Sequence, residues 1–350
     1  MINSMKKILL LLMSLILLLA ACGKSDNPNS KENEMLVSLL LDEYGIEDQA
    51  INSKAYQGLL DLKVDTGIAI DYQVAAYEAD YEASIESLIQ RGAKLVWGVG
   101  YQTADAIQEA AHKNKDLNFA SLDNIYDEDS MPKNLTGSIF NTEETSYLLG
   151  YVAGLATKTN RLAYLGHQRG VLSDKDEFGF RAGVYDASKE RQKKINLSIE
   201  YLQTYSDQGK GRTIAKSLYD SGVDIIFTNA GLGDLGAIDA AKEKNKFVLV
   251  TDSQLIKQAP NHVMLAAEKK YEEAINTISS RFIAKEAIGG KNFELGLKNN
   301  CLDISPYDED KNLIEASIYQ KALKKKKDIV DGKKIVPYDQ KTFDKFSSSK

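Results

Sequence analysis

Residues 224–250 read DIIFTNAGLGDLGAIDAAKEKNKFVLV and contain a complete strand–helix–strand unit. The runs DIIF and FVLV are apolar without alternation, which is typical of strands that are covered on both faces of a sheet. The glycines after residue 230 mark the turn that opens the intervening helix. A strand, a crossover helix and a second strand predict a parallel sheet, and therefore an α/β fold.

The same alternation extends over the chain from residue 35 onward. Helical windows carry apolar side chains on one face, as at Tyr81, Ile85 and Leu88, and lie between short apolar runs. The length of 350 residues favours two lobes over one large sheet, because a domain averages roughly 150 residues. We expect strands at residues 35–41, 68–75, 94–99, 118–122, 137–140, 162–166, 197–202, 224–228 and 246–250.

The composition excludes several classes of protein. Charged residues make up 27% and hydrophobic residues 43% of the chain, which is too apolar for a disordered chain. The formal net charge of −6 gives no reason to expect nucleic acid as a partner. The chain has only two cysteines and three scattered histidines, and it lacks the motifs of zinc proteases, serine hydrolases and P-loop proteins. We therefore expect no cofactor, no metal site and no catalytic residue.

The N-terminus resembles a bacterial lipoprotein signal. Lys6 and Lys7 precede an apolar run over residues 8–19, which is too short to span a bilayer. The run ends in Leu-Ala-Ala-Cys at residues 19–22. By this resemblance residues 1–21 are a signal peptide, Cys22 is acylated and anchors the protein to the membrane, and residues 22–34 form a flexible tether. The alternative is an ordinary secretory signal in which Cys22 has no such role.

Residues 231–236 read GLGDLG and match the dinucleotide-binding pattern G-x-G-x-x-G after a strand. Asp252 follows about twenty residues later, as the pattern requires. The pattern normally belongs to the first strand–helix unit, however, and an exported protein rarely meets a dinucleotide. We therefore favour a glycine loop that approaches some other ligand closely.

A series of short motifs runs along the chain in a fixed order. They are LLLD at 39–42, GIED at 45–48, NSKAYQGL at 52–59, WGVGY at 97–101, ETSYLLGY at 144–151, GFRAGV at 179–184, GKG at 209–211, AG at 230–231, TDS at 251–253 and a lysine at 269. Taken in order, these motifs resemble those of the basic membrane protein family, the lipid-anchored nucleoside-binding proteins of ABC importers. The resemblance covers about residues 35–340.

The resemblance implies a type I periplasmic-binding-protein fold. In this fold two α/β lobes, each a doubly wound parallel sheet, are joined by hinge crossovers and hold the ligand in the cleft between them. The implied first lobe contains residues 35–140 and about 257–287. The implied second lobe contains residues 141–256 and about 288–345.

The implied ligand contacts lie at the carboxyl ends of the predicted strands, where ligands of open α/β sheets bind. By the resemblance, Asp123 bonds the edge of the base, and Asp252 and Lys269 bond ribose hydroxyls. The remaining implied contacts are the side chains of Asp42 and Asn52 and the backbone of Gly231. An aspartate at a strand–helix turn can instead serve only as a helix cap.

Two positions depart from the family pattern. Ile51 and Asp176 stand where the family has aromatic residues that stack on the base. Each stacking contact contributes roughly 1–3 kcal/mol, so the loss of both could change the ligand. The aromatic residues that could compensate are Tyr44, Tyr101 and Phe178, and we expect Tyr101 to contact the ligand.

The sequence therefore predicts an extracytoplasmic solute-binding protein held at the cell membrane by a lipid anchor. It would capture a small polar ligand, with nucleosides as the leading class, by closure of the lobes, and pass it to an ABC permease. One alternative is an exported nucleoside hydrolase-like enzyme, which would need a positioned acid–base pair or a metal. Another is a ligand sensor or adhesion lipoprotein on the same fold, which differs only in its partners.

Overall fold

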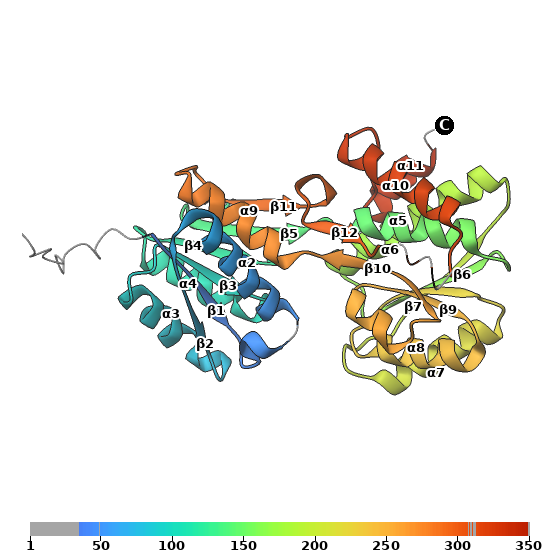
Figure 1. Cartoon of the computed structure of the whole chain (residues 1–350), viewed down its shortest axis with the longest axis horizontal. Helices are drawn as coiled ribbons and strands as arrows, with labels where there is room; N and C mark the ends of the chain where they lie inside the picture. Colours follow the sequence, from blue (N-terminus) through green and yellow to red (C-terminus); the bar gives the residue numbers. More distant parts are fainter. Residues whose placement is uncertain (1–34, 49, 307, 309, 311–312, 349–350) are drawn as a thin grey trace, which may run out of the picture.

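The computed structural model describes residues 35–48, 50–306, 308, 310 and 313–348. The predicted signal peptide, the tether and Cys22 lie outside the described residues. Over the described part of the chain, none of the helices has the length and apolar character needed to span a bilayer. Two α/β lobes lie side by side and are connected by several crossovers of the chain (Figure 1).

The first lobe is built on a six-stranded sheet with the order β11-β5-β4-β3-β1-β2, in which every pair is parallel. Its strands are β1 (Leu36–Leu41), β2 (Ala69–Val74), β3 (Leu95–Val99), β4 (Asn118–Leu122), β5 (Leu135–Phe140) and β11 (Lys291–Leu295). Its helices are α2 (Ile51–Thr66), α3 (Tyr81–Gln90), α4 (Ala104–Lys113) and α9 (Tyr271–Ile283), with short 3-10 turns η2 (Gly45–Glu47), η3 (Glu78–Asp80) and η4 (Tyr101–Thr103).

Helices cover both faces of this sheet, as the apolar strand sequences predict. Leu39 belongs to the apolar cluster that includes Leu59 of α2 and Ile275 of α9. Its neighbour Leu40 belongs to the cluster that includes Ile85 of α3 and Ile107 of α4. Adjacent strand residues therefore bury their side chains on opposite faces, because successive side chains of a strand alternate.

The second lobe has a six-stranded sheet with the order β12-β10-β9-β8-β6-β7, in which β12 alone pairs antiparallel. Its strands are β6 (Arg161–Gly166), β7 (Asn196–Tyr201), β8 (Ile225–Asn229), β9 (Phe247–Val250), β10 (Val263–Lys269) and β12 (Leu302–Ile304). Its helices are α5 (Thr142–Ala156), α6 (Val171–Arg191), α7 (Gln208–Asp220), α8 (Gly233–Lys244), α10 (Ala316–Val330) and α11 (Gln340–Ser348), with 3-10 turns η5 (Ser253–Gln258) and η6 (Leu297–Asn299).

The two-lobed α/β architecture confirms the predicted fold class, and all nine predicted strands are present within two residues of their expected ends. Strands β10, β11 and β12 were not predicted from the sequence. Sheet membership also corrects part of the predicted lobe boundaries, which placed residues 257–287 in the first lobe and residues 288–345 in the second. Strand β10 falls within 257–287 but pairs with β9 in the second sheet, whereas β11 falls after 288 but pairs with β5 in the first. Hydrogen bonding to distant strands, which local patterns do not encode, decides this membership.

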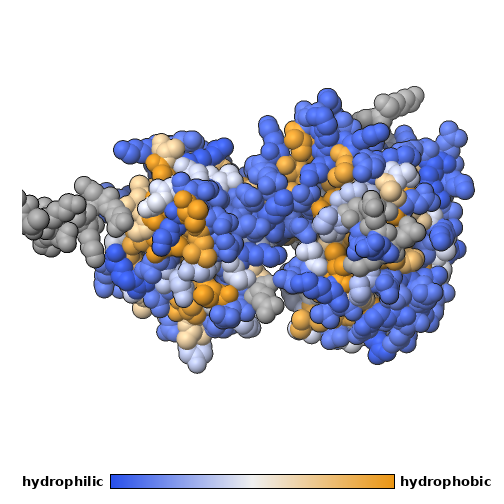
Figure 2. Space-filling view, viewed as in Figure 1, coloured by the Kyte–Doolittle hydropathy of each residue, from blue (hydrophilic) through white to orange (hydrophobic). Residues whose placement is uncertain are grey.

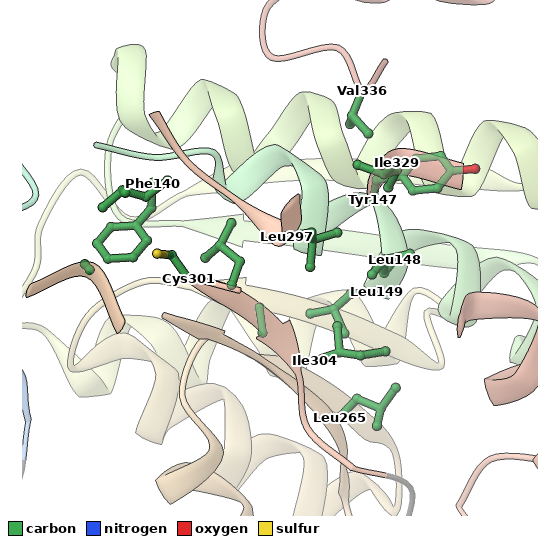
Figure 3. Close-up of a cluster of buried hydrophobic side chains, with 14 of the residues drawn as sticks. Phe140, Tyr147, Leu148, Leu149, Leu265, Leu297, Cys301, Ile304, Ile329 and Val336 are labelled. Carbon is green, nitrogen blue, oxygen red and sulfur yellow. The ribbon is translucent and has the colours of Figure 1, made fainter. Parts of the chain in front are cut away.

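Three crossovers connect the lobes, and a buried apolar cluster surrounds them. The chain passes from β5 to α5 at Asn141, from β10 to α9 at Lys270, and from β11 to η6 at Gly296. Side chains from β5, α5, β10, β12 and α10 pack together here (Figure 3). Cys301 lies in this cluster beside Phe140 (Figure 3), and burial raises the pKa of its thiol to about 11. A protonated, buried thiol of this kind has a structural role rather than a nucleophilic one.

The surface is hollowed between the two lobes, next to the crossovers (Figure 2). The chain leaves the first sheet from the carboxyl end of β5 and the second sheet from the carboxyl end of β10. Because the other parallel strands run in the same direction, the carboxyl edges of both sheets face the opposite lobe. The residues that follow these strands therefore border the cleft between the lobes.

Candidate functional site

Two of the predicted residues form a buried polar pair at the first lobe's edge of the cleft. Asp42 follows β1, and its Oδ1 accepts hydrogen bonds from Asn52 Nδ2 at 2.6 Å and from the Tyr44 amide at 3.1 Å. Asn52 lies in the first turn of α2, where its backbone N–H donates to Asp48 Oδ2. Among the described residues, the buried Asn52 Oδ1 has no hydrogen-bond partner. The pair thus presents a fixed carboxylate and an unused amide oxygen.

Tyr81, which the sequence places only on the apolar face of a helix, lies close to this pair. Burial, with the charge of Asp42 as the next cause, raises the pKa of Tyr81 to about 12. Its hydroxyl is buried and, within the described part of the chain, has no hydrogen-bond partner. A helix-face tyrosine in sequence looks like an ordinary core residue, so no local signal could have identified it.

Two other predicted residues, Asp123 and Lys269, form an ion pair between the lobes. Asp123 follows β4 with a left-handed φ of 63°, and its Oδ2 lies 2.7 Å from Lys269 Nζ at the end of β10. Burial opposes the charge of Lys269, but the negative charge of Asp123 outweighs it and the pKa of Lys269 is raised. The lysine also lies 5.3 Å from the centre of the Phe140 ring. The structure therefore joins two predicted ligand contacts that are 146 residues apart in the sequence.

The predicted contact Asp252 follows β9 and caps η5. Its Oδ1 accepts a hydrogen bond from the Gln254 amide at 2.8 Å. The side chain is half-buried, and no hydrogen bond engages Oδ2 among the described residues. The capping role that the sequence analysis left open is therefore present, and one carboxylate oxygen remains available for a ligand.

The glycines of the GLGDLG motif approach the protein's own backbone. Gly231 has a φ of 62°, and a Cβ added there would lie 2.5 Å from the carbonyl oxygen of Tyr205. A Cβ at Gly236 would lie 2.1 Å from the carbonyl oxygen of Gln208. These contacts pack α8 closely against α7 and the loop before it. Close packing within the lobe therefore accounts for glycine at these two positions, and the predicted contact of the Gly231 backbone with a ligand stays a prediction.

Asp176, one of the two departures from the family pattern, is a buried acid on α6. Its side chain is 5% exposed. Its Oδ1 accepts a hydrogen bond from Ser146 Oγ at 2.9 Å and its Oδ2 accepts one from Asn229 Nδ2 at 2.6 Å. Burial raises the pKa of Asp176, while hydrogen bonds and the charge of Lys269 oppose that rise. Asp176 therefore contributes a preorganised carboxylate at a position where the resemblance implied an aromatic ring.

The aromatic residues predicted to compensate differ in their positions. Tyr101 lies in η4 after β3 and is 75% exposed, and Tyr44 is also exposed. Phe178 is buried and its ring lies 6.1 Å from that of Phe343 in α11. It therefore packs in the interior of the second lobe, and its proposed stacking role is wrong. The other departure, Ile51, packs against the core of the first lobe.

An aromatic pair that was not predicted from the sequence lies at the second lobe's edge of the cleft. His167 follows β6, and its ring stacks on that of Tyr205 with centroids 4.1 Å apart and an interplanar angle of 22°. Tyr205 lies in the loop between β7 and α7 and is 53% exposed. The only local signal was an aromatic residue in a polar turn after a strand.

The described residues contain no cluster of three or more side chains suited to hold a metal ion. A cavity of about 630 Å³ lies elsewhere, in the second lobe between η5, β10 and the segment after β12. None of the predicted site residues lines it. The open cleft between the lobes, rather than this cavity, collects the polar side chains described above.

Comparison with known proteins agrees with this architecture. Residues 35–340 match the family described as ABC transporter substrate-binding protein, PnrA-like. Basic membrane protein D of Borreliella burgdorferi is 32% identical over 335 residues, which cover 95% of this chain and 96% of the relative. Basic membrane protein A of the same species is 29% identical and covers 98% of both chains.

Solved structures show the same fold at low sequence identity. An ABC transporter solute-binding protein from Conexibacter woesei aligns with a TM-score of 0.71 and 18% identity, and covers 87% of this chain and 99% of that one. A solute-binding protein from Aeropyrum pernix aligns with a TM-score of 0.67 and 19% identity, and covers 89% and 96%. These two neighbours support the two-lobed solute-binding fold.

Proposed function

The chain belongs to the family of PnrA-like ABC transporter substrate-binding proteins, and from this premise we propose that it is a lipid-anchored receptor that captures a nucleoside outside the cytoplasmic membrane for an ABC importer. The single observation that carries the proposal is the set of polar side chains at the carboxyl edges of both sheets. Carboxylates accept hydrogen bonds from hydroxyl and amino groups, which are the groups that a nucleoside presents.

Each part of the proposed ligand has a matching group. Three charged groups lie toward the crossovers: the carboxylate of Asp123 after β4, the carboxylate of Asp252 after β9 and the ammonium of Lys269 at the end of β10. In our proposal Asp123 bonds the base, and Asp252 and Lys269 bond ribose hydroxyls. Asp42 and Asn52 would bond the ligand from the first lobe, further from the crossovers. A ligand without the right donors would leave these groups desolvated and unpaired, which provides specificity.

The Asp123–Lys269 ion pair connects ligand binding to lobe closure. The pair joins the end of β4 in one lobe to the end of β10 in the other. A ligand that bonds to both groups would replace or share this contact while the lobes close around it. Capture without chemical change is then sufficient for delivery to a permease, so we propose no catalysed reaction.

Calorimetry with the purified protein tests the ligand class. We expect nucleosides to bind, with free bases and free ribose binding much more weakly because each lacks half of the hydrogen-bonding groups. Mass spectrometry of any co-purified small molecule provides an independent check. Binding of a sugar or an amino acid with no binding of any nucleoside would overturn the nucleoside part of the proposal.

The same preparation tests for catalysis. Adenosine, inosine and uridine incubated with the protein should be recovered intact by chromatography. Release of free base that increases with protein concentration would instead support the hydrolase alternative.

The proposed anchor depends on Cys22, which lies outside the described residues. Cys22→Ser should release the protein into the medium or leave an uncleaved precursor, because the acylated thiol would be lost. Cell fractionation and N-terminal analysis measure both outcomes. Unchanged membrane retention together with unchanged processing would contradict the lipid anchor.

A further inference from the structure

We propose that Tyr205, stacked on His167, is a platform in the second lobe that binds the planar ring of the ligand. This inference rests on the proposed function and deepens it, because it names the surface that receives the base. The platform consists of these two side chains and the two loops that carry them.

The stack leaves one ring face for a ligand. His167 covers one face of Tyr205 at a centroid distance of 4.1 Å, and the tyrosine side chain remains 53% exposed. Burial lowers the pKa of His167, which favours the neutral imidazole, and the two rings stack with an interplanar angle of 22°. A large aromatic ring that is held rigidly yet half-exposed at a cleft offers a stacking surface at little entropic cost.

Three backbone contacts hold the platform in place. The Thr204 amide donates to the His167 carbonyl oxygen at 3.3 Å, and the Leu232 amide donates to the Tyr205 carbonyl oxygen at 2.8 Å. The left-handed Gly231 lets the β8–α8 turn approach the Tyr205 backbone, since any Cβ there would lie 2.5 Å from the carbonyl oxygen. The glycine therefore contributes to the site by positioning Tyr205.

The order of strands places this platform opposite the polar groups of the first lobe. Counted from the crossover side, β1 and β6 are both fifth in their sheets, and β3 and β8 are both fourth. Asp42 and His167 therefore occupy equivalent positions, as do Tyr101 and Gly231. The electrostatic influence of Tyr101 on the Tyr205 hydroxyl agrees with this placement, although burial is the larger cause of the raised pKa of Tyr205. A ring on the platform would lie within the cleft.

Calorimetric titration with adenosine, inosine and uridine tests the platform. Tyr205→Ala should weaken purine nucleoside binding roughly tenfold to a hundredfold, which corresponds to one base–aromatic stacking contact. Tyr205→Phe keeps the ring and should stay within about threefold of wild type. The loss should be larger for the purines than for uridine, because a purine covers more of the ring.

Tyr338→Ala provides the matched control, because Tyr338 is a tyrosine of the same lobe with a similar exposure of 47%. It should bind nucleosides like wild type. Thermal unfolding of each variant identifies any loss of folding.

The other possible binding results contradict either the platform or the proposed function. If wild type binds nucleosides and folded Tyr205→Ala binds them equally well, the platform is wrong and the proposed function stands. The platform is also wrong if Tyr205→Phe loses as much affinity as Tyr205→Ala, or if Tyr338→Ala does. If wild type binds none of the nucleosides, the proposed function is wrong and the platform for a base is wrong with it.

Discussion

The two lobes have the same strand order but present different chemistry to the cleft. At the first lobe, Asp42 and Asn52 bond mainly to each other, and the amide oxygen of Asn52 is left unpaired within the described residues. At the second lobe, both oxygens of Asp176 accept hydrogen bonds from Ser146 and Asn229. The first lobe therefore keeps an unpaired amide oxygen at its buried pair, whereas two hydrogen bonds fix the geometry of the buried acid in the second lobe.

The aromatic residues show the opposite contrast. Tyr101 of the first lobe is 75% exposed, and no ring of the described residues stacks on it. Tyr205 of the second lobe is stacked on His167. We infer that the first lobe supplies polar contacts and a ring without a stacking neighbour, and that the second lobe supplies a ring held by its neighbour. Four predictions test this difference.

Gly231→Ala should have the largest effect. The substitution combines a left-handed φ, which costs about 1–2 kcal/mol for a residue with a Cβ, with a clash against the Tyr205 backbone that costs about 1–3 kcal/mol. We expect the free energy of unfolding to fall by about 2–5 kcal/mol, and nucleoside affinity to fall in the molecules that remain folded. Denaturant unfolding and calorimetry measure these two changes.

Gly67→Ala in the first lobe is the control for this prediction. Gly67 also has a positive φ, of 73°, but no atom lies within 4 Å of the added Cβ. Gly67→Ala should lower the free energy of unfolding only by the cost of the left-handed φ, and it should leave ligand binding unchanged. Equal losses in the two variants would show that the close approach to Tyr205 has no energetic importance.

The second prediction concerns the pH dependence of stability. Glu143 lies in the first turn of α5, and burial raises its pKa to about 7, although Lys175 Nζ at 3.2 Å opposes the rise. The folded state then binds a proton that the unfolded state loses near pH 4.3. The stability from this group is therefore complete below about pH 4.3 and is lost progressively as the pH rises from there through about 7, by up to about 4 kcal/mol.

Glu143→Gln should remove this part of the pH dependence. Unfolding measured between pH 5 and 8 should show a flatter profile for the variant than for wild type. Glu82 of the first lobe is the control, because its hydrogen bond with Lys113 lowers its pKa. Glu82→Gln should therefore not alter the dependence of stability on pH between pH 5 and 8. Parallel profiles for wild type and Glu143→Gln would mean that Glu143 is ionised throughout.

The third prediction separates capping from ligand binding at Asp252. A hydrogen bond to a charged group contributes about 1.5–3 kcal/mol, so Asp252→Ala should weaken ligand binding roughly tenfold to a hundredfold. The loss of the η5 cap should cost only about 1 kcal/mol of stability. Calorimetry and thermal unfolding give the two values.

Asp207→Ala removes a comparable cap in the same lobe, since Asp207 Oδ1 accepts from the Lys210 amide at 2.8 Å. It should lose similar stability and keep its affinity. If Asp252→Ala also keeps its affinity, the carboxylate is only a cap.

The smallest expected effect belongs to Tyr101→Ala. Without a ring behind it, Tyr101 should contribute about 1 kcal/mol, the lower end of the roughly 1–3 kcal/mol range for stacking on a base. Calorimetry with the nucleoside that binds most tightly measures the change against Tyr205→Ala. A larger loss for Tyr101→Ala than for Tyr205→Ala would reverse the proposed division between the lobes.

Local sequence patterns predicted most of the fold. Nine strands were identified because buried parallel strands are continuous apolar runs bounded by turns. Strands β11 and β12 are short and half-polar, and their pairing with β5 and β10 joins segments far apart in the chain. Periodicity describes a residue's neighbours in sequence, so it could not assign these strands to a sheet.

For the site, the sequence by itself determined which polar side chains follow the strands, because a strand end and an aspartate after it are local features. Only the tertiary structure decided which of them meet. Asp123 and Lys269 face each other because β4 and β10 belong to different sheets whose carboxyl edges are opposed. Tyr205 became an aromatic platform, and Phe178 a core residue, because His167, Gly231 and Phe343 were brought beside them by packing between distant segments. The free energy of such contacts depends on the distance between the side chains in space, and their separation along the sequence does not specify that distance.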